Sequence, residues 1–275
     1  MLPPARAFFP VPFSPEEGKE LLRSSDPPSH TGSSSTDHPM KIHTSPETVP
    51  PRSSDKSFTV VWDIDRTLIN IDQISKGIGN SFIYRPYALQ SLRALSDHYP
   101  QIEFIVWTAG DVNHARYVIT DILQRHPKIR FDHVIARTPG EPTDHRQHSR
   151  KPLQLLKRDV RSMIIVDDSP SVCQHNPSNC IAVYPYEGSE SLKGPDCDLF
   201  YVAQVIGMCA ALSSKMKISF SEAMSGLPFV ARAMSKNVEY SCINWSIRDK
   251  ASLQSAIKKS FSRLPHVHGL SHERQ

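Results

Sequence analysis

Short apolar runs alternate with amphipathic segments along the middle of this chain of 275 residues. The runs at residues 58–62, 102–107, 163–166 and 180–183 are four to six residues long and rich in apolar, mostly β-branched side chains. Strands with no polar face are typical of a parallel sheet that helices cover on both sides. The pattern therefore predicts an α/β fold around a central, mostly parallel sheet.

The segments between these runs have the spacing of helices. One predicted helix follows Pro86 and ends before Pro100, and another follows Asp111, a favourable N-cap residue. Each carries an apolar stripe at helical spacing. The stripes consist of Leu89, Leu92 and Leu95 in the first helix and of Val112, Ala115, Val118, Ile119 and Ile122 in the second. A further strand is predicted at 133–136 and a further helix at 152–158.

Three regions of different composition divide the chain. Residues 1–55 hold 11 of the 23 prolines and ten serines, so they bury too little apolar surface to offset the entropy of ordering and are predicted to form a disordered tail. Residues 56–213 carry the alternating pattern and are predicted to form one domain. Residues 214–275 are predicted to form a helical extension, with helices near 220–234 and 250–261.

Composition also limits the class of protein. No apolar run approaches the roughly 20 residues of a membrane-spanning helix, and four prolines interrupt the apolar start, so neither a membrane segment nor a secretory signal is expected. The net charge of +4 is modest and does not by itself decide whether the chain binds nucleic acid. No direct nucleic-acid partner and no membrane partner are expected. An odd number of scattered cysteines predicts reduced thiols in an intracellular protein, either nuclear or cytoplasmic. They are Cys173, Cys180, Cys197, Cys209 and Cys242.

Carboxylates follow two of the predicted strands directly. One strand runs into Asp63 and Asp65, and another runs into Asp167 and Asp168. The carboxyl ends of parallel strands meet at one edge of a sheet, where ligands gather. Neighbouring carboxylates repel unless a cation or a shared proton compensates, so this grouping favours a metal site or acid–base chemistry. Taken alone, the first pair is more typical of a turn that Asp63 caps than of a functional site.

A hydroxyl group and a lysine extend the set. Thr108 follows the strand at 102–107, and Lys151 lies 16 residues before Asp167. Clustered carboxylates with one lysine are the groups that Mg²⁺ and a transferable phosphoryl group need. The combination therefore indicates magnesium-dependent phosphoryl transfer.

The aspartate pairs, the threonine and the lysine, in their order along the chain, resemble the motifs of the haloacid dehalogenase superfamily. Within it, the chain resembles the phosphatases that act on the C-terminal repeats of RNA polymerase II and their small, NLI-interacting-factor-like relatives, which contain an FCP-like domain. The resemblance covers residues 58–212 and rests on D-x-D-x-T, a strand ending in Thr-Ala, a lysine and D-D-S-P. It also includes Arg85-Pro86 and the H-N-P-S-N sequence at 175–179. It implies the Rossmann-like haloacid dehalogenase fold.

The resemblance implies that Asp63 is the nucleophile, which becomes transiently phosphorylated. Asp65 would protonate the leaving alkoxide and then deprotonate the water that attacks the aspartyl phosphate. Independently of the resemblance, a phosphate dianion repels a carboxylate nucleophile, so cations must offset that repulsion. Division of the hydrolysis into two displacements lets one acid–base group serve both.

The resemblance also implies the binding residues. Thr108, Lys151 and Arg137 would hold the phosphate of the substrate. Asp167 and Asp168 would bind Mg²⁺ together with Asp63 and the main-chain carbonyl of Asp65.

Three functions stay open at this point. Residues 70–84 form a short segment after the first motif, which leaves the site open to a protein loop and favours a phosphoserine or phosphothreonine protein phosphatase. The RNA polymerase II tail is one candidate substrate, although the proline pocket of the relatives depends on a longer insertion. A small-metabolite phosphatase would need a lid from this segment or from the C-terminal extension. A catalytically silent binding module would be expected to lack part of the motif set, which is complete here.

Overall fold

The structure, a computed structural model, describes residues 41–70, 82–142, 146–188, 196–227, 230–235 and 238–243. The strands in chain order are β1 (Ile42–His43), β2 (Phe58–Trp62), β3 (Ile69–Asn70), β4 (Ile83–Tyr84), β5 (Ile102–Asp111), β6 (His133–Arg137), β7 (Met163–Asp167), β8 (Cys180–Ala182), β9 (Val230–Ser235) and β10 (Val238–Ile243). The helices are α2 (Ala88–His98), α3 (Val112–Arg125), α4 (Arg146–Arg150), α5 (Pro170–His175), α6 (Asp198–Met216) and α7 (Phe220–Ser225). Short 3₁₀ turns are η2 (Pro46–Thr48), η4 (Leu153–Leu156) and η5 (Val160–Ser162).

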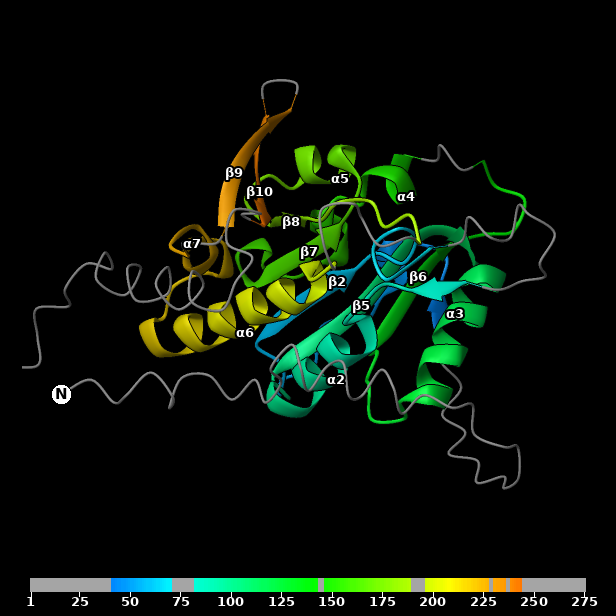
Figure 1. Cartoon of the computed structure of the whole chain (residues 1–275), viewed down its shortest axis with the longest axis horizontal. Coiled ribbons are helices and arrows are strands. Elements are labelled where there is room, and N and C mark those ends of the chain that lie inside the picture. The colour runs from blue at the N-terminus through cyan, green and yellow to red at the C-terminus, as the bar shows by residue number, and fades with distance from the viewer. Residues whose placement is uncertain are drawn as a thin grey trace, which may run out of the picture.

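Eight strands form one sheet in the order β1-β6-β5-β2-β7-β8-β10-β9 (Figure 1). All neighbours pair in parallel except β9 and β10, which are antiparallel. The mostly parallel α/β fold predicted from the sequence is therefore confirmed. After β2 the chain adds β5 and β6 on one side of it, and then β7 and β8 on the other side. Such a switch point is where open α/β sheets bind their ligands.

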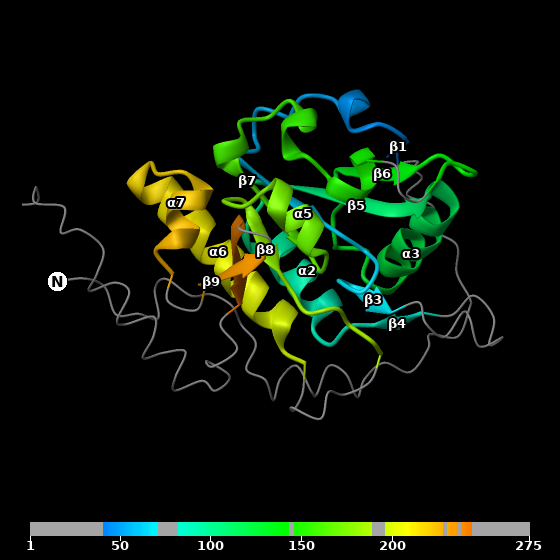
Figure 2. The ribbon, with the colours of Figure 1, turned by 90° about the horizontal axis from the view of Figure 1, so that it is seen from above.

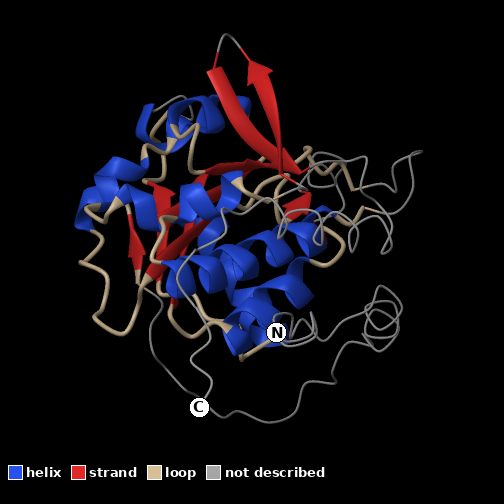
Figure 3. Ribbon diagram, turned by 90° about the vertical axis from the view of Figure 1, so that its left-hand side faces the viewer, coloured by secondary structure: helices blue, strands red, loops and turns tan. Residues whose placement is uncertain are grey.

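Alternate side chains of the central strands enter two apolar layers. Val60 and Trp62 of β2 belong to a large core with buried residues of α2, α3, α6 and α7. Val61 of β2 and Trp107 of β5 belong to a smaller core with η4 and α5. The sheet thus lies between helices on both sides (Figure 3), with α6 and α7 toward one end and α3 toward the other (Figure 2).

Helix α6 is the most apolar of the helices and lies in the large core, against α2 and α7. Among the described residues, it alone is long and apolar enough to cross a membrane by length and composition. Within the fold, 67% of that apolar window is buried. Such burial is typical of a core helix.

The ordered fold begins earlier than composition predicts. The predicted tail spans residues 1–55, whereas β1 pairs in parallel with β6 and Val49 is only 3% exposed. The serines and prolines here form turns; for example, the Ser45 side chain caps η2. Residues 42–49 therefore belong to the ordered fold and not to a disordered tail, and residues 1–40 lie outside the described residues.

The C-terminal extension is only partly helical. The predicted helix at 220–234 stops at Ser225, with Gly226 as its C-cap, and Val230–Ser235 forms β9 instead. Strand β10 adds to the edge of the sheet beside β8. This pairing joins segments about 60 residues apart, so the local sequence pattern of the extension does not reveal it. The predicted helix at 250–261 lies outside the described residues.

Two further local predictions need correction. The predicted helix at 152–158 is the single 3₁₀ turn η4, which Lys157 ends in a left-handed conformation.

Cys173 and Cys180 form a disulfide, so the prediction of reduced thiols is wrong for this pair. Helix α5 is short and the chain returns at once to β8, which brings their Cα atoms to 5.1 Å. Among the described residues, Cys197 and Cys209 form no disulfide.

Candidate active site

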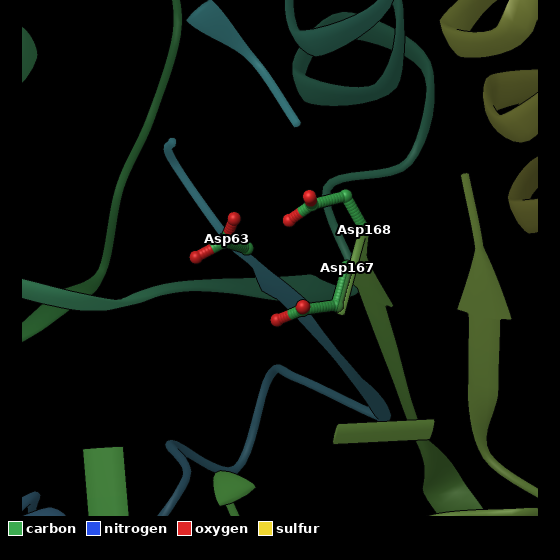
Figure 4. Close-up of side chains that lie close together, drawn as sticks. All are labelled: Asp63, Asp167 and Asp168. Carbon is green, nitrogen blue, oxygen red and sulfur yellow. The ribbon is translucent and has the colours of Figure 1, made fainter. Parts of the chain in front are cut away.

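Three aspartates converge where β2 and β7 end. Asp63 follows β2 directly, and its main-chain N–H donates to the carbonyl of Val166 in β7 at 3.1 Å. This pairing of neighbouring strands places Asp63 beside Asp167 and Asp168. One carboxylate oxygen of each aspartate lies within 4.8 Å of the others, and the three side chains approach one another in Figure 4.

Lys151 lies inside this group and is only 3% exposed. Its Nζ pairs with Asp63 Oδ1 and, at 2.7 Å, with Asp167 Oδ2. The Asn176 side chain braces the lysine loop, because its amide donates to the Lys151 carbonyl at 3.1 Å and its oxygen accepts from Leu153 N–H at 3.1 Å. The H-N-P-S-N sequence therefore positions the lysine.

One lysine does not neutralise three carboxylates. Burial, together with the charge of Asp63, raises the pKa of Asp167 to about 7 against the opposing effect of Lys151. Burial and Asp63 likewise raise the pKa of Asp168 to about 6. Burial also raises the pKa of Asp63. Burial alone would lower the pKa of Lys151, but its two ion pairs outweigh burial and raise it. The group therefore needs a further cation to ionise fully near neutral pH.

The donor set fits a divalent metal ion. Asp63, Asp167 and Asp168 offer carboxylate oxygens, the hard donors that Mg²⁺ and similar ions prefer. Ser169 N–H donates to Asp167 Oδ1 at 2.8 Å and orients that ligand. The Nε of Arg66 lies 3.8 Å from Asp168 Oδ2, at the exposed side of the group.

Asp65 has its own contacts, which differ from those of the three aspartates. Its Oδ2 accepts the hydroxyl of Thr108 at 3.0 Å, and its Oδ1 lies 2.6 Å from the Nε2 of His114. The Thr108 hydroxyl, predicted to bind phosphate, thus contacts the predicted acid–base residue. The Asp65 side chain is 24% exposed, which leaves it accessible to a substrate.

Arg137 does not join the carboxylates through any described contact. Its guanidinium donates to the carbonyls of Ala109, at 3.2 Å, and Glu141. Arg137 therefore braces the chain next to Thr108 at the same edge of the sheet. His114 is a site residue that the motifs do not predict, although its place in the first turn after a strand end is a usable signal.

Comparisons with known proteins place these observations in a family. Residues 58–215 match the model of the NLI interacting factor-like phosphatase family. No curated protein sequence matches the chain.

Among solved structures, a beryllium fluoride complex of a variant of the fission yeast RNA polymerase II CTD phosphatase Fcp1 is 16% identical, with a TM-score of 0.46, over 64% of this chain and 71% of the other. A further structure, of Fcp1 described as an essential RNA polymerase II CTD phosphatase, is 17% identical, with a TM-score of 0.37, over 76% and 62%. A putative beta-phosphoglucomutase from Thermotoga maritima is 12% identical, with a TM-score of 0.30, over 53% and 91%. These likenesses are distant, whereas the family match covers more than half of the chain and all the residues of the site described in this subsection. The chain therefore belongs to the NLI interacting factor-like phosphatases of the haloacid dehalogenase superfamily.

Proposed function

We propose that this protein hydrolyses phosphomonoesters with Mg²⁺ through an aspartyl phosphate on Asp63, and that its substrates are phosphoserine or phosphothreonine side chains of proteins. The observation that supports this most is the placement of Asp63. It lies beside Lys151 and within 4.8 Å of Asp167 and Asp168, while Asp65 is held separately, two residues later. A nucleophile, its cations and an acid–base group are thus adjacent but distinct.

In this proposal Asp63, Asp167, Asp168 and the Asp65 carbonyl hold Mg²⁺. When bound, the ion supplies positive charge that offsets the repulsion between a phosphoryl dianion and a carboxylate. Lys151 adds a buried positive charge against Asp63 from the protein side. Thr108 and Arg137, at the same edge of the sheet, are the proposed further contacts for the phosphate.

The reaction takes two displacements. An oxygen of Asp63 attacks phosphorus as the ester P–O bond breaks, and protonated Asp65 gives its proton to the leaving oxygen. The resulting Asp65 carboxylate then takes a proton from water as that water attacks the phosphorus of the aspartyl phosphate. Inorganic phosphate leaves, and both aspartates return to their initial states.

The short chain segment between β3 and β4, next to the site, supports a protein substrate. Strands β3 and β4 pair through Ile69 with Tyr84 and Asn70 with Ile83, so only residues 71–82 separate them. A segment of this length is too short for a cap domain of the kind that would enclose a small metabolite. A loop of a phosphoprotein in the nucleus or cytoplasm is the substrate we propose.

A metal-dependent assay tests the proposal. We expect the protein to release p-nitrophenol from p-nitrophenyl phosphate with Mg²⁺, not with chelator, and to form an acid-stable phosphoryl adduct on Asp63. Asp97→Asn, a matched change of an exposed residue, should leave both unchanged. A panel of phosphopeptides, including the RNA polymerase II repeat, against sugar and nucleotide phosphates then tests the substrate class. Selectivity among the small metabolites would contradict a protein substrate, and the absence of any turnover would contradict the enzyme.

A further inference from the structure

The carboxylate of Asp65 is held at both of its oxygens. Thr108 donates its hydroxyl to Oδ2 at 3.0 Å, and the Nε2 of His114 lies 2.6 Å from Oδ1. The N–H of Gly110 donates to the Thr108 hydroxyl oxygen at 2.9 Å, which leaves the hydroxyl hydrogen for Asp65. An aspartate side chain otherwise rotates about two single bonds, so these two contacts fix its orientation.

His114 is in turn fixed by the start of α3. The side chain of the N-cap residue Asp111 accepts the His114 main-chain N–H at 3.0 Å, which sets the first turn at the end of β5. The imidazole packs against Gly110, where an added Cβ would lie 2.6 Å from the ring Cδ2. The ring can therefore reach Asp65 only because residue 110 has no side chain.

We propose that His114 is a positioning residue, which donates its Nε2 hydrogen to Asp65 and holds that carboxyl group in the orientation for proton transfer to the leaving oxygen. The proposal rests on the proposed function, in which Asp65 is the acid and base. After Asp65 gives up its proton, its carboxylate only accepts hydrogen bonds, so the hydrogen shared with His114 then lies on Nε2. A carboxylate has about four lone-pair sites, and the Thr108 and His114 contacts leave one on each oxygen for the transferred proton.

This role predicts that the loss of activity without His114 depends on how basic the leaving group is. Nitrophenolate leaves as a stable anion, whereas phenolate and the serine alkoxide are stronger bases and need the proton of Asp65 as the P–O bond breaks. Loss of His114 should therefore slow poor leaving groups more than good ones. The ratio kcat/KM includes only the steps through phosphoryl transfer to Asp63, so it separates this effect from hydrolysis of the aspartyl phosphate.

The test compares p-nitrophenyl phosphate, phenyl phosphate and a phosphoserine peptide at one pH with saturating Mg²⁺. His114→Phe keeps a ring over Gly110 but removes the donor, and we expect kcat/KM to fall ~10-fold or more for the two poor leaving groups and less than ~3-fold for p-nitrophenyl phosphate. His114→Gln, which keeps an N–H of similar reach, should recover most of the loss. Asn113→Ala, an exposed change in the same turn, should match the wild type on all three substrates.

An equal loss on all three substrates, or no loss on any, would overturn the proposal, as would a His114→Gln variant as impaired as His114→Phe. Should His114→Phe fail to fold, Gly110→Ala tests the same idea, because its Cβ displaces the ring and should give the same leaving-group selectivity. An inactive wild type or an active Asp63→Asn would instead refute the proposed function, so the two failures can be told apart.

Discussion

The two ends of the central strands both bury charged side chains, but they balance the charges differently. At the amino end, Glu103 of β5 is 2% exposed and forms two hydrogen bonds with Arg158, from Nε at 2.9 Å and from an Nη at 2.6 Å. Thr59 of β2 donates to the same carboxylate at 2.7 Å. At the carboxyl end, Lys151 faces three carboxylates.

This difference in charge compensation distinguishes a structural ion pair at the amino end from a candidate active site at the carboxyl end. Arg158 also donates to the carbonyls of Leu156, at 2.5 Å, and Pro50, at 2.8 Å, so the amino-end pair is complete without a ligand. Buried charges need such partners, because an unpaired charge in the interior is costly. The carboxyl end lacks them, and its raised carboxylate pKa values are the consequence. The carboxylate cluster, whose negative charge is only partly compensated, is therefore the candidate site for a metal ion and a substrate.

The sharpest test of the comparison is Asp63→Asn. The amide keeps the shape but cannot accept a phosphoryl group, so we expect turnover to fall ~10⁴-fold or more. The change also removes one of the crowded charges, so the free energy of unfolding without metal should not decrease. Steady-state kinetics and urea unfolding measure the two effects, and an active Asp63→Asn would show that the nucleophile is another residue.

Glu103→Gln should lower stability and leave turnover unchanged, which is the opposite of the result expected for Asp63→Asn. It leaves Arg158 buried without its counter-charge, which typically costs about 3–5 kcal/mol of unfolding free energy. The kcat of the folded protein should stay at the wild-type value, because Glu103 lies at the far end of the strands. Glu47→Gln, an exposed change, is the control for unfolding by urea. A stable but slow Glu103→Gln would contradict the division between the two ends.

Lys151→Ala should lower kcat/KM by ~10²-fold or more, because it removes a preorganised cation beside the nucleophile. The matched control is Lys157→Ala, since Lys157 is exposed and, within the described part of the chain, its Nζ donates to the Glu47 carbonyl at 3.2 Å. Equal kinetics of the two variants would show that Lys151 does not act on the phosphoryl group.

Local patterns are enough to predict most of the sheet. Strands β2, β5, β6, β7 and β8 begin at the predicted residues, because each is a buried apolar run whose period needs no partner to be recognised. Asp111 caps α3 as predicted, because capping depends on one side chain and the following turn. Strands β1, β9 and β10, at the two ends of the sheet, are not predicted from the sequence, since β1 and β10 are placed by pairing with β6 and β8, and β9 by pairing with β10.

The same limit applies to the site. The motifs predict that Asp63 and Asp167 lie at strand ends, which parallel pairing brings together, and that Lys151 belongs to the same site. The sequence does not predict that His114 contacts Asp65 or that Arg137 binds main-chain carbonyls. Those contacts depend on side-chain orientation at a helix start and a strand end, which residue spacing does not determine.

A smaller effect is expected from Asp168→Asn. An amide oxygen can replace one carboxylate oxygen as a ligand, so activity should survive with a several-fold weaker affinity for Mg²⁺. The ion pair with Arg66, at 3.8 Å and partly exposed, should contribute little to stability. Magnesium titrations of activity for this variant and the wild type measure the shift. A dead Asp168→Asn would mean that its charge is required for the reaction.

The smallest expected effect is a pH-dependent difference in how far Mg²⁺ stabilises the fold. In the metal-free protein the pKa of Asp167 is about 7 and that of Asp168 about 6, above the ordinary value of roughly 4 for an unfolded chain. Between these values the folded state binds more protons than the unfolded state, so stability is fully present below pH ~4 and is lost as pH rises through the folded pKa values.

Mg²⁺ should reverse that loss, because it binds the ionised carboxylates and competes with protons. The increase in Tm caused by Mg²⁺ should therefore be a few degrees larger at pH 8 than at pH 5.5. Scanning calorimetry with Mg²⁺ or chelator at each pH measures it, and K⁺ at matched ionic strength controls for screening. Asp63→Asn, with one repelling charge fewer, should narrow the difference between the two pH values. An equal increase at both would mean that the ion does not bind through these carboxylates, and the uncompensated charge at the carboxyl end would then need another explanation.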